Sequence, residues 1–108
     1  GRSDDMLKVS GIYVSPFEVE ATLAQHPAVL EAAVIGKQDE EGLTKTKAFV
    51  VLKPGHGPEA VAGMRTFIKD KIGKWKYPRW IEIIDDLPKT ATGKIQRFRL
   101  RDLEKNAS

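Results

Sequence analysis

The fold is decided by two neighbouring stretches, Val29–Ile35 (VLEAAVI) and Lys45–Leu52 (KTKAFVVL). The first is a short apolar run that lies between a proline and a glycine, which predicts a strand buried on both faces. The second alternates in part, and Lys45 and Lys47 near its start are expected to point outward. A polar turn over residues 37–42 joins the two stretches, so together they predict a β-hairpin.

Helical patterns precede and follow this hairpin. Before it, Ser15 is a predicted N-cap, Pro16 occupies the first helical position and Glu18 completes a capping box. After it, apolar residues recur at helical spacing over 61–72, and Gly73 is a typical C-terminal stop. The sequence therefore predicts one helix on each side of the hairpin.

The two ends of the chain carry shorter patterns. Met6–Val9 and Ile12–Val14 flank a Ser-Gly pair and predict a small hairpin. Trp80–Ile84 predicts a third strand, and Ile95, Phe98 and Leu103 indicate a terminal helix with an arginine-rich outer face. Together these patterns predict an α+β domain: a small, mostly antiparallel sheet of about three strands plus a short N-terminal hairpin, flanked by about three helices.

The composition narrows the class of protein. The chain has 108 residues, 41% apolar and 31% charged, which fits one globular domain and argues against disorder. No apolar run approaches the roughly 20 residues that span a bilayer, so no membrane contact is expected. The chain opens without an apolar segment and contains no cysteine, so a signal peptide and a disulfide framework are not expected and the cytoplasm is the expected location. His26 and His56 lie far apart, and no metal site is expected.

Charge is distributed unevenly along the chain. Residues 1–68 carry 7 Lys/Arg against 9 Asp/Glu, whereas residues 69–108 carry 11 against 6. Aromatic residues are interleaved with this basic charge over 74–80. Such a region attracts phosphates, either of nucleic acid or of a nucleotide. A nucleic-acid-binding module, and a merely solvated basic surface, therefore stay open as alternatives at this point.

The loop Leu87–Lys94 (LPKTATGK) is the candidate for chemistry. It resembles a phosphate-binding P-loop only in part, because Pro88 stands at the leading glycine position and Ile95 replaces the Mg²⁺-binding Ser or Thr. A Thr-Gly-Lys sequence alone is typical of a surface turn. From these residues alone, a catalytic lysine and an ordinary turn are both open.

Two motifs at opposite ends of the chain carry a family resemblance. Pro-x-x-x-x-Gly-Lys at 88–94, with Gly1–Lys8 (GRSDDMLK) and Ser10-Gly11, resembles the C-terminal domain of adenylate-forming enzymes. These enzymes include acyl-CoA synthetases, peptide-synthetase adenylation domains and firefly luciferase. Gly11–Glu20 (GIYVSPFEVE) is most similar to benzoate-CoA ligases and related aryl-CoA ligases. Another branch of the superfamily is the alternative.

The resemblance implies a domain arrangement and a reaction. Residues 1–108 would be a mobile C-terminal domain, whose partner is a large N-terminal domain absent from this chain. The full enzyme would join a carboxylic acid such as benzoate to ATP as an acyl-adenylate, and coenzyme A would then displace AMP. Mg²⁺ would be bound mainly by the absent domain. The isolated domain is expected to be inactive, unless it serves alone as an interaction domain.

The resemblance also assigns the lysine of the loop. Lys94 would be the catalytic lysine of the adenylation step, because an ammonium can pair with a carboxylate and a phosphate while charge builds on the phosphoryl oxygens. The corresponding family lysine is reversibly acetylated. Acetylation of Lys94 by a protein acetyltransferase, and its removal by a deacetylase, would switch off adenylation because the charge is lost.

Further roles are implied for residues near the start of the chain. Asp4 would be the hinge between the domains, and Arg2 would contact the nucleotide. The Ser10-Gly11 turn and Lys8 would serve the coenzyme A step, because a glycine leaves room for a thin pantetheine path. Lys69 would contact the phosphates of coenzyme A; a solvated lysine on an outer helix face is the alternative.

Overall fold

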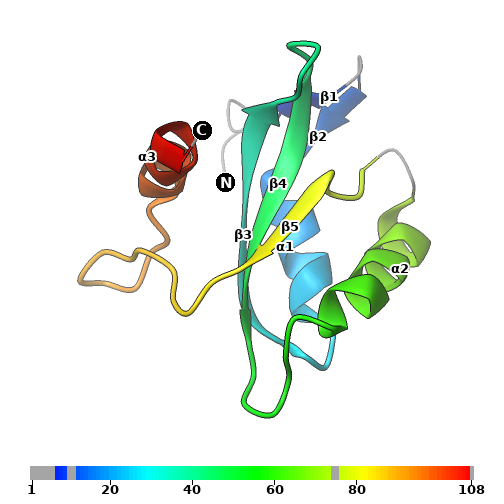
Figure 1. The fold of residues 1–108 in the computed structure, drawn as a ribbon, viewed down its shortest axis with the longest axis vertical. Helices are drawn as coiled ribbons and strands as arrows, with labels where there is room; N and C mark the ends of the chain where they lie inside the picture. Colours follow the sequence, from blue (N-terminus) through cyan, green and yellow to red (C-terminus); the bar gives the residue numbers. More distant parts are fainter. Residues whose placement is uncertain (1–6, 10–11, 74–75, 108) are drawn as a thin grey trace.

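The computed structural model describes residues 7–9, 12–73 and 76–107. In chain order the elements are β1 (Leu7–Val9), β2 (Ile12–Val14), α1 (Pro16–Ala24), β3 (Val29–Gln38), β4 (Thr44–Leu52), α2 (Ala60–Ile72), β5 (Trp80–Ile83) and α3 (Arg97–Ala107). Figure 1 shows the long β3–β4 hairpin at the centre, with helices on either side. None of the helices in the described ranges has the length and apolar character that a bilayer crossing requires.

The central sheet has the strand order β3-β4-β5. β3 and β4 pair antiparallel, from Val29 opposite Leu52 to Gln38 opposite Thr44. β5 pairs parallel with β4, because the chain crosses over through α2 before it returns to the sheet. The small three-stranded sheet is confirmed as a mixed sheet, with one antiparallel and one parallel pairing, and β1 and β2 form the separate antiparallel pair that the sequence predicts.

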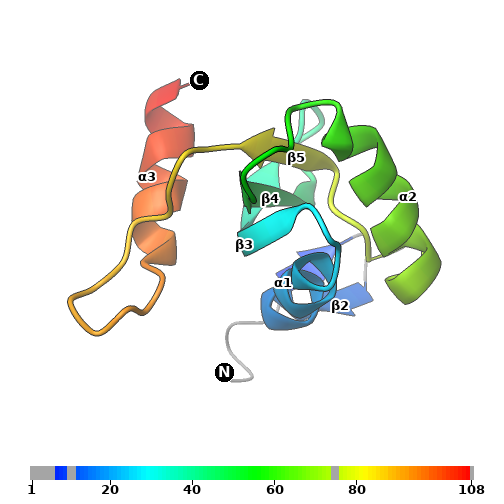
Figure 2. The same cartoon turned by 90° about the horizontal axis from the view of Figure 1, so that it is seen from below.

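The sheet is covered on both faces, as Figure 2 shows. α1 and α2 pack on one face through a cluster of fully buried side chains that includes Leu23, Met64 and Ile68. On the other face, Leu100 of α3 and Leu87 pack against a second set of strand residues. Buried β3 side chains belong to both clusters, which confirms the expectation of a strand buried on both faces for its central part.

Two of the predicted start signals of α1, the Ser15 N-cap and Pro16, are present, whereas the Glu18 carboxylate pairs with Lys76. The Ser15 hydroxyl oxygen accepts the Glu18 backbone N–H at 3.4 Å, and Pro16 is the first helical residue. Val14 and Val19, which flank the cap, are both fully buried. Gly73 ends α2 with φ of +90°, a conformation that favours glycine. Local sequence signals were therefore sufficient to predict the start of α1 and the end of α2.

The structure corrects two predictions about which side chains point inward. Lys47 is only 6% exposed, although an outward position was predicted for it. Strand alternation places it on the same face as Phe49, beneath α3. The buried apolar residue of α3 is Leu100, whereas Phe98 and Leu103 are 52% and 58% exposed. The inward face of α3 consists of Arg97, Leu100 and Glu104, which are spaced by three and four residues and so share one side of the helix.

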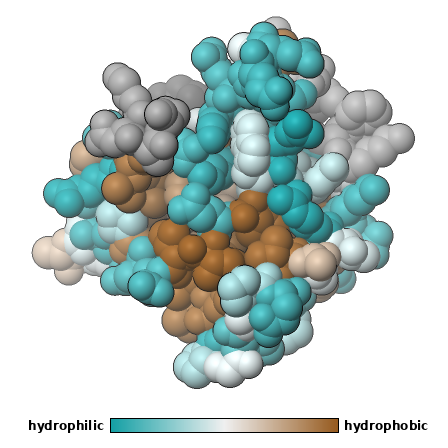
Figure 3. Space-filling view, viewed as in Figure 1, coloured by the Kyte–Doolittle hydropathy of each residue, from teal (hydrophilic) through white to brown (hydrophobic). Residues whose placement is uncertain are grey.

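Apolar side chains around β5 are partly exposed at the surface. Figure 3 shows apolar side chains gathered in the middle of this face of the molecule, around β5. β5 is one of the two edge strands of the sheet, and its Ile81 and Ile83 are only half buried. The edge is short, at four residues, which limits its capacity to pair with a strand of another molecule.

Candidate functional site

The loop that carries Lys94 is closed by its own hydrogen bonds. The Thr90 backbone N–H donates to the Lys94 carbonyl oxygen at 2.8 Å, and the Lys94 N–H donates to the Thr90 hydroxyl oxygen at 3.1 Å. The Gly93 N–H donates to the Thr90 carbonyl at 2.9 Å, and the hydroxyl oxygens of Thr90 and Thr92 lie 2.9 Å apart. Threonine and glycine are thus required for the shape of the loop, and the Lys94 side chain is left exposed.

The loop is also fastened to the rest of the domain at its base. Leu87 is 3% exposed, and the Gln96 N–H donates to the Pro88 carbonyl at 2.8 Å. Lys89 forms an isolated antiparallel bridge with Ile95 through the backbone. The Lys89 ammonium pairs with Glu31 of β3. Both arms of the loop are therefore tied together and held against the sheet.

Gly93 has φ of +89°, which a residue with a Cβ adopts only with strain. We expect Gly93→Ala to lower the free energy of unfolding by about 1 kcal/mol, because no neighbour clashes with the added methyl group and backbone strain is the only cost. The same change at Gly42, with φ of +79° and equally open space, should cost about as much in the β3–β4 turn. Chemical denaturation of both variants measures the cost. A cost for Gly93→Ala well above that for Gly42→Ala would contradict backbone strain as the main cost at Gly93.

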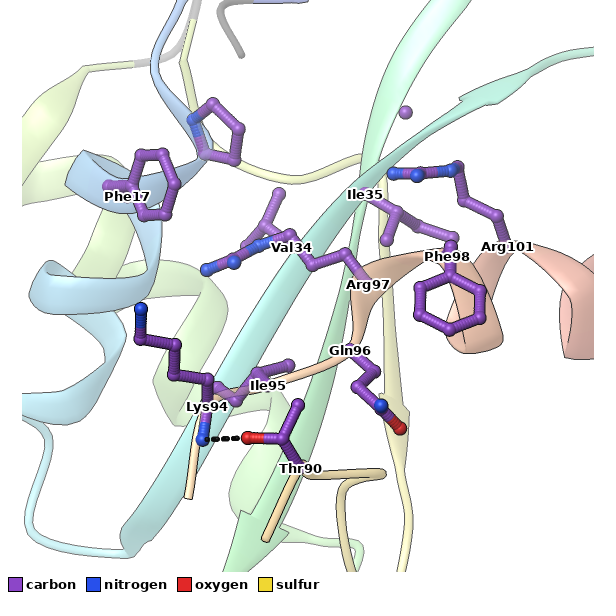
Figure 4. Close-up of a pocket in the computed structure, with 12 residues that line it drawn as sticks. Phe17, Val34, Ile35, Thr90, Lys94, Ile95, Gln96, Arg97, Phe98 and Arg101 are labelled. Carbon is purple, nitrogen blue, oxygen red and sulfur yellow. Dashed lines mark hydrogen bonds between the residues drawn. The ribbon is translucent and has the colours of Figure 1, made fainter. Parts of the chain in front are cut away.

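A cavity of about 400 Å³ lies between the first residues of α1, the β3 edge and the start of α3. Lys94, Arg97 and Arg101 supply its cationic lining, and Phe17 and Phe98 supply aromatic rings. Figure 4 shows the Lys94 and Arg97 side chains extending toward α1 near Phe17. In the part of the chain that the structure describes, no carboxylate forms an ion pair with the Lys94 ammonium. The ammonium is thus available to an anionic group of another molecule or domain.

Arg97 is held much more firmly than Lys94. Its Nε donates to the Glu20 carboxylate at 2.9 Å, and its terminal nitrogen pairs with the other oxygen of the same carboxylate. Glu20 also accepts the Val34 backbone N–H at 2.7 Å. The guanidinium carbon lies 4.4 Å from the centroid of the Phe17 ring. The first residue of α3 is therefore attached to α1 and to the edge of β3 at a single point.

A second charged cluster holds the other end of α3. Glu104 pairs with both Lys37 and Lys47, and Lys47 also pairs with Glu82 at 2.8 Å. Burial alone would lower the pKa of Lys47, but hydrogen bonds and charges from Glu104 and Glu82 outweigh it and raise that pKa. Burial likewise opposes ionisation of Glu104, and the two lysines outweigh it and lower the pKa of its carboxyl. Each group is thus kept charged by its partners.

Two of the other residues singled out from the sequence, Lys69 and Lys8, lie within the described ranges. Lys69 is exposed on α2, on the opposite face of the sheet from α3, and its Nζ lies 6.0 Å from the Tyr77 ring centroid. Lys8 is in β1, opposite Tyr13 in the pairing with β2. Arg2, Asp4, Ser10 and Gly11 lie outside the described residues. The structure thus brings Lys94 together with Arg97 and Arg101, two residues that the sequence did not single out.

No cluster of three or more histidine, cysteine, aspartate or glutamate side chains suited to a metal ion occurs within the described ranges. His26 has a local role instead. Its Nδ1 accepts the Ala28 N–H at 3.1 Å, and its ring meets Phe67 edge-on at 5.1 Å between centroids.

Comparison with known proteins supplies the family. Residues 18–94, from α1 to Lys94 itself, match the AMP-binding enzyme C-terminal domain. The chain belongs to the AMP-binding enzyme C-terminal domain family. This confirms the predicted family, and the match includes the loop motif at residues 88–94. A loop that exposes the Lys94 ammonium beside a cationic cavity is suited to bind an anionic group.

Individual relatives are ligases that act on aromatic acids. The chain is 66% identical over 103 residues to a benzoate–CoA ligase of Thauera aromatica, covering 94% of this chain and 20% of that protein. It is 55% identical over 106 residues to a 4-hydroxybenzoate–CoA/benzoate–CoA ligase of Rhodopseudomonas palustris, covering 95% and 20%. A solved anthranilate CoA ligase in complex with anthranoyl-AMP matches with a TM-score of 0.88 and 56% identity, over 95% of this chain and 20% of that chain. This chain spans about one fifth of the length of these relatives.

Proposed function

We propose that this chain is the C-terminal domain of an AMP-forming aryl-CoA ligase that acts on benzoate or a closely similar aromatic acid. The observation that carries the proposal is the exposed Lys94 ammonium on a loop whose backbone is fixed by hydrogen bonds. The named acids of the similar proteins support the aromatic substrate. ATP and coenzyme A would be the other substrates, with Mg²⁺ and the acid bound mainly by the large domain.

Lys94 would serve the first of two steps. An oxygen of the carboxylate attacks the α-phosphorus of ATP, an acyl O–P bond forms, and pyrophosphate leaves. Two anions must approach each other in this step, and negative charge builds on the phosphoryl oxygens. An ammonium delivered by a preorganised loop stabilises that charge, most strongly where the large domain excludes water.

The coenzyme A step would require another orientation of this domain. The thiol attacks the acyl carbon, a thioester forms, and AMP leaves. Lys69 lies on the α2 side of the sheet, whereas Lys94 lies on the α3 side. One orientation cannot bring both faces to the same reacting centre. Rotation about a hinge at Asp4 would let Lys94 and Arg2 serve adenylation, and Lys8, Ser10, Gly11 and Lys69 serve thioester formation.

Reversible acetylation of Lys94 would regulate the first step. The side chain is exposed, and no carboxylate among the described residues forms an ion pair with it, so an acetyltransferase and a deacetylase could reach its ammonium. Acetylation removes the positive charge that adenylation needs. Mass spectrometry of the enzyme after treatment with an acetyl donor and acetyltransferase, followed by deacetylase, tests this proposal through the loss and recovery of adenylation.

The alternative of a nucleic-acid-binding module is disfavoured by the family to which the chain belongs, and five of its basic residues are also paired internally. Ion pairs with carboxylates occupy Lys37, Lys47, Lys76, Lys89 and Arg97. A surface that binds phosphates along a nucleic acid needs a stripe of free cations. The salt dependence of any nucleic-acid binding would distinguish the two functions.

The substrate proposal is tested with the full-length enzyme and a panel of acids. We expect CoA thioester formation from benzoate and its small ring-substituted analogues, with AMP and pyrophosphate as products. Short aliphatic acids should react much more slowly. Thioester formation restricted to aliphatic acids would contradict the aromatic assignment and leave the family intact.

A further inference from the structure

We infer that Arg97 and Glu20 act as a pair of positioning residues that fix where Lys94 lies relative to the rest of the domain. This inference deepens the proposed function, because it concerns the same lysine. Arg97 is three residues beyond Lys94, and the two side chains line the same cavity. Neither Arg97 nor Glu20 was singled out by the loop motif.

The hydrogen bonds within the loop set its shape but not its place. The bonds between Thr90, Gly93 and Lys94 all begin and end inside the loop. A loop closed in this way can still pivot as one unit about its base. What decides the location of the Lys94 ammonium is therefore how residues 88–97 are attached to the sheet and to α1.

The Arg97–Glu20 pair is the less exposed of the two ion pairs that attach residues 88–97 to the rest of the described chain. The Glu20 carboxylate is 12% exposed and the Arg97 side chain 23%, whereas the Lys89–Glu31 pair at the other arm is about 30% exposed on both sides. A forked guanidinium–carboxylate pair fixes direction as well as distance. Exposed ion pairs fix little, because solvent and side-chain entropy oppose them.

Glu20 also connects this pair to the sheet. β3 is an edge strand, so one of its sides has no neighbouring strand. The Glu20 carboxylate accepts the Val34 N–H at that edge at 2.7 Å while it holds Arg97. Phe17 lies one turn earlier on α1. The Arg97 guanidinium packs over the Phe17 ring, with its central carbon 4.4 Å from the ring centroid. Arg97 is thus held between α1, β3 and α3.

These contacts occupy most of the Arg97 guanidinium. Its Nε and one terminal nitrogen donate to Glu20, and its central carbon lies 4.4 Å from the Phe17 ring centroid. A guanidinium held by these contacts affects the reaction by positioning Lys94. A displacement of about 1 Å at a reacting group costs on the order of 100-fold in rate, so a firm attachment at this point has a kinetic consequence.

The test uses Arg97→Lys and Glu20→Gln in the full-length enzyme, with each half-reaction assayed separately. Arg97→Lys keeps the positive charge but loses the two parallel hydrogen bonds that a guanidinium donates to a carboxylate. Glu20→Gln keeps an oxygen for the Val34 N–H but loses the charge. We expect each variant to lower kcat for aryl-adenylate formation by about 10- to 100-fold with unchanged KM for ATP and acid. Thioester formation from supplied aryl-adenylate should be unchanged.

The double variant, Arg97→Lys with Glu20→Gln, distinguishes positioning by one shared contact from two independent effects. Because both residues act through one contact, the double variant should be no slower in adenylation than the slower single variant. Glu18→Gln is the matched control: it lies on the same helix and breaks an exposed ion pair with Lys76 at 3.3 Å. It should leave both half-reactions unchanged.

Three outcomes would overturn the inference. Equal losses in both half-reactions would show a merely structural role. A large loss in Arg97→Lys with none in Glu20→Gln would show direct contact of Arg97 with substrate. Adenylation unchanged in both variants would show that the pair does not position Lys94. An unmodified enzyme that forms no aryl-adenylate would instead contradict the proposed function, and is recognised before any variant is compared.

Discussion

Lys94→Ala in the full-length enzyme is expected to slow aryl-adenylate formation by about 10²- to 10³-fold, the usual cost of removing one preorganised group that stabilises transition-state charge. The ammonium is exposed, and within the described part of the chain it makes no ion pair, so its removal leaves no buried charge behind. Stability should therefore be unchanged. The loss would come from the reaction and not from the fold.

The second half-reaction provides the contrast. Thioester formation from supplied aryl-adenylate and coenzyme A should stay within about twofold of the unmodified enzyme, because an interaction made in one transition state affects that step alone. Lys53→Ala, which removes another exposed loop lysine, should alter neither step. Equal loss of both half-reactions in Lys94→Ala would contradict a role confined to adenylation.

Glu104→Gln is expected to produce the largest loss of stability among the changes considered, about 2–4 kcal/mol in the free energy of unfolding. Lys47 is 6% exposed, and the loss of Glu104 leaves it only Glu82, whose side chain is 51% exposed. A buried ammonium without its main partner is costly. Lys37 would lose its carboxylate in the same variant.

Chemical denaturation of the 108-residue domain measures this loss. Glu18→Gln, which breaks the exposed pair with Lys76, should cost no more than about 0.5 kcal/mol. A Glu104→Gln domain as stable as the Glu18→Gln domain would show that the Lys37–Glu104–Lys47 cluster does not stabilise α3.

The same cluster sets an acid limit on stability. The pKa of Glu104 is lowered in the folded state from its ordinary value of 4.5, so its contribution is present above that value and is lost as pH falls through the folded-state pKa. The pKa of Lys47 is raised from 10.5, so its contribution is present below that value and is lost only as pH rises through the folded-state pKa. Unfolding free energy measured against pH should fall on the acid side below 4.5, and less steeply in Glu104→Gln.

Features with local causes were predictable from the sequence. Ser15, Pro16 and Glu18 lie within four residues of one another, and together they placed the start of α1 correctly. The hairpin followed from two apolar stretches separated by a short polar turn. The structure shows longer strands than the apolar runs suggested, because Asp39 accepts the N–H groups of Glu41 and Leu43 and tightens the turn.

Features that depend on distant partners were not predictable. Lys47 meets Glu82 and Glu104 across 35 and 57 residues of sequence, and Arg97 meets Glu20 across 77. No short-range sequence pattern predicts ion pairs between residues so far apart in the chain. One signal was present for Lys47, since strand alternation puts it on the same side as Phe49 and Val51, which are buried. For α3, the buried face has a charged residue at each end, Arg97 and Glu104, and only Leu100 between them is apolar. The spacing of apolar residues alone therefore indicated the exposed Phe98 and Leu103 instead of Leu100.

The proposal that this domain delivers Lys94 to an aryl-adenylate-forming site is tested in a single turnover without coenzyme A. The full-length enzyme is mixed with benzoate and ATP labelled at the α-phosphate, and the enzyme-bound products are separated after quenching. Labelled benzoyl-AMP should form in the unmodified enzyme, and Lys94→Ala should form it about 10²- to 10³-fold more slowly. Benzoyl-AMP formed at the same rate by both enzymes, or ADP as the labelled product, would contradict it.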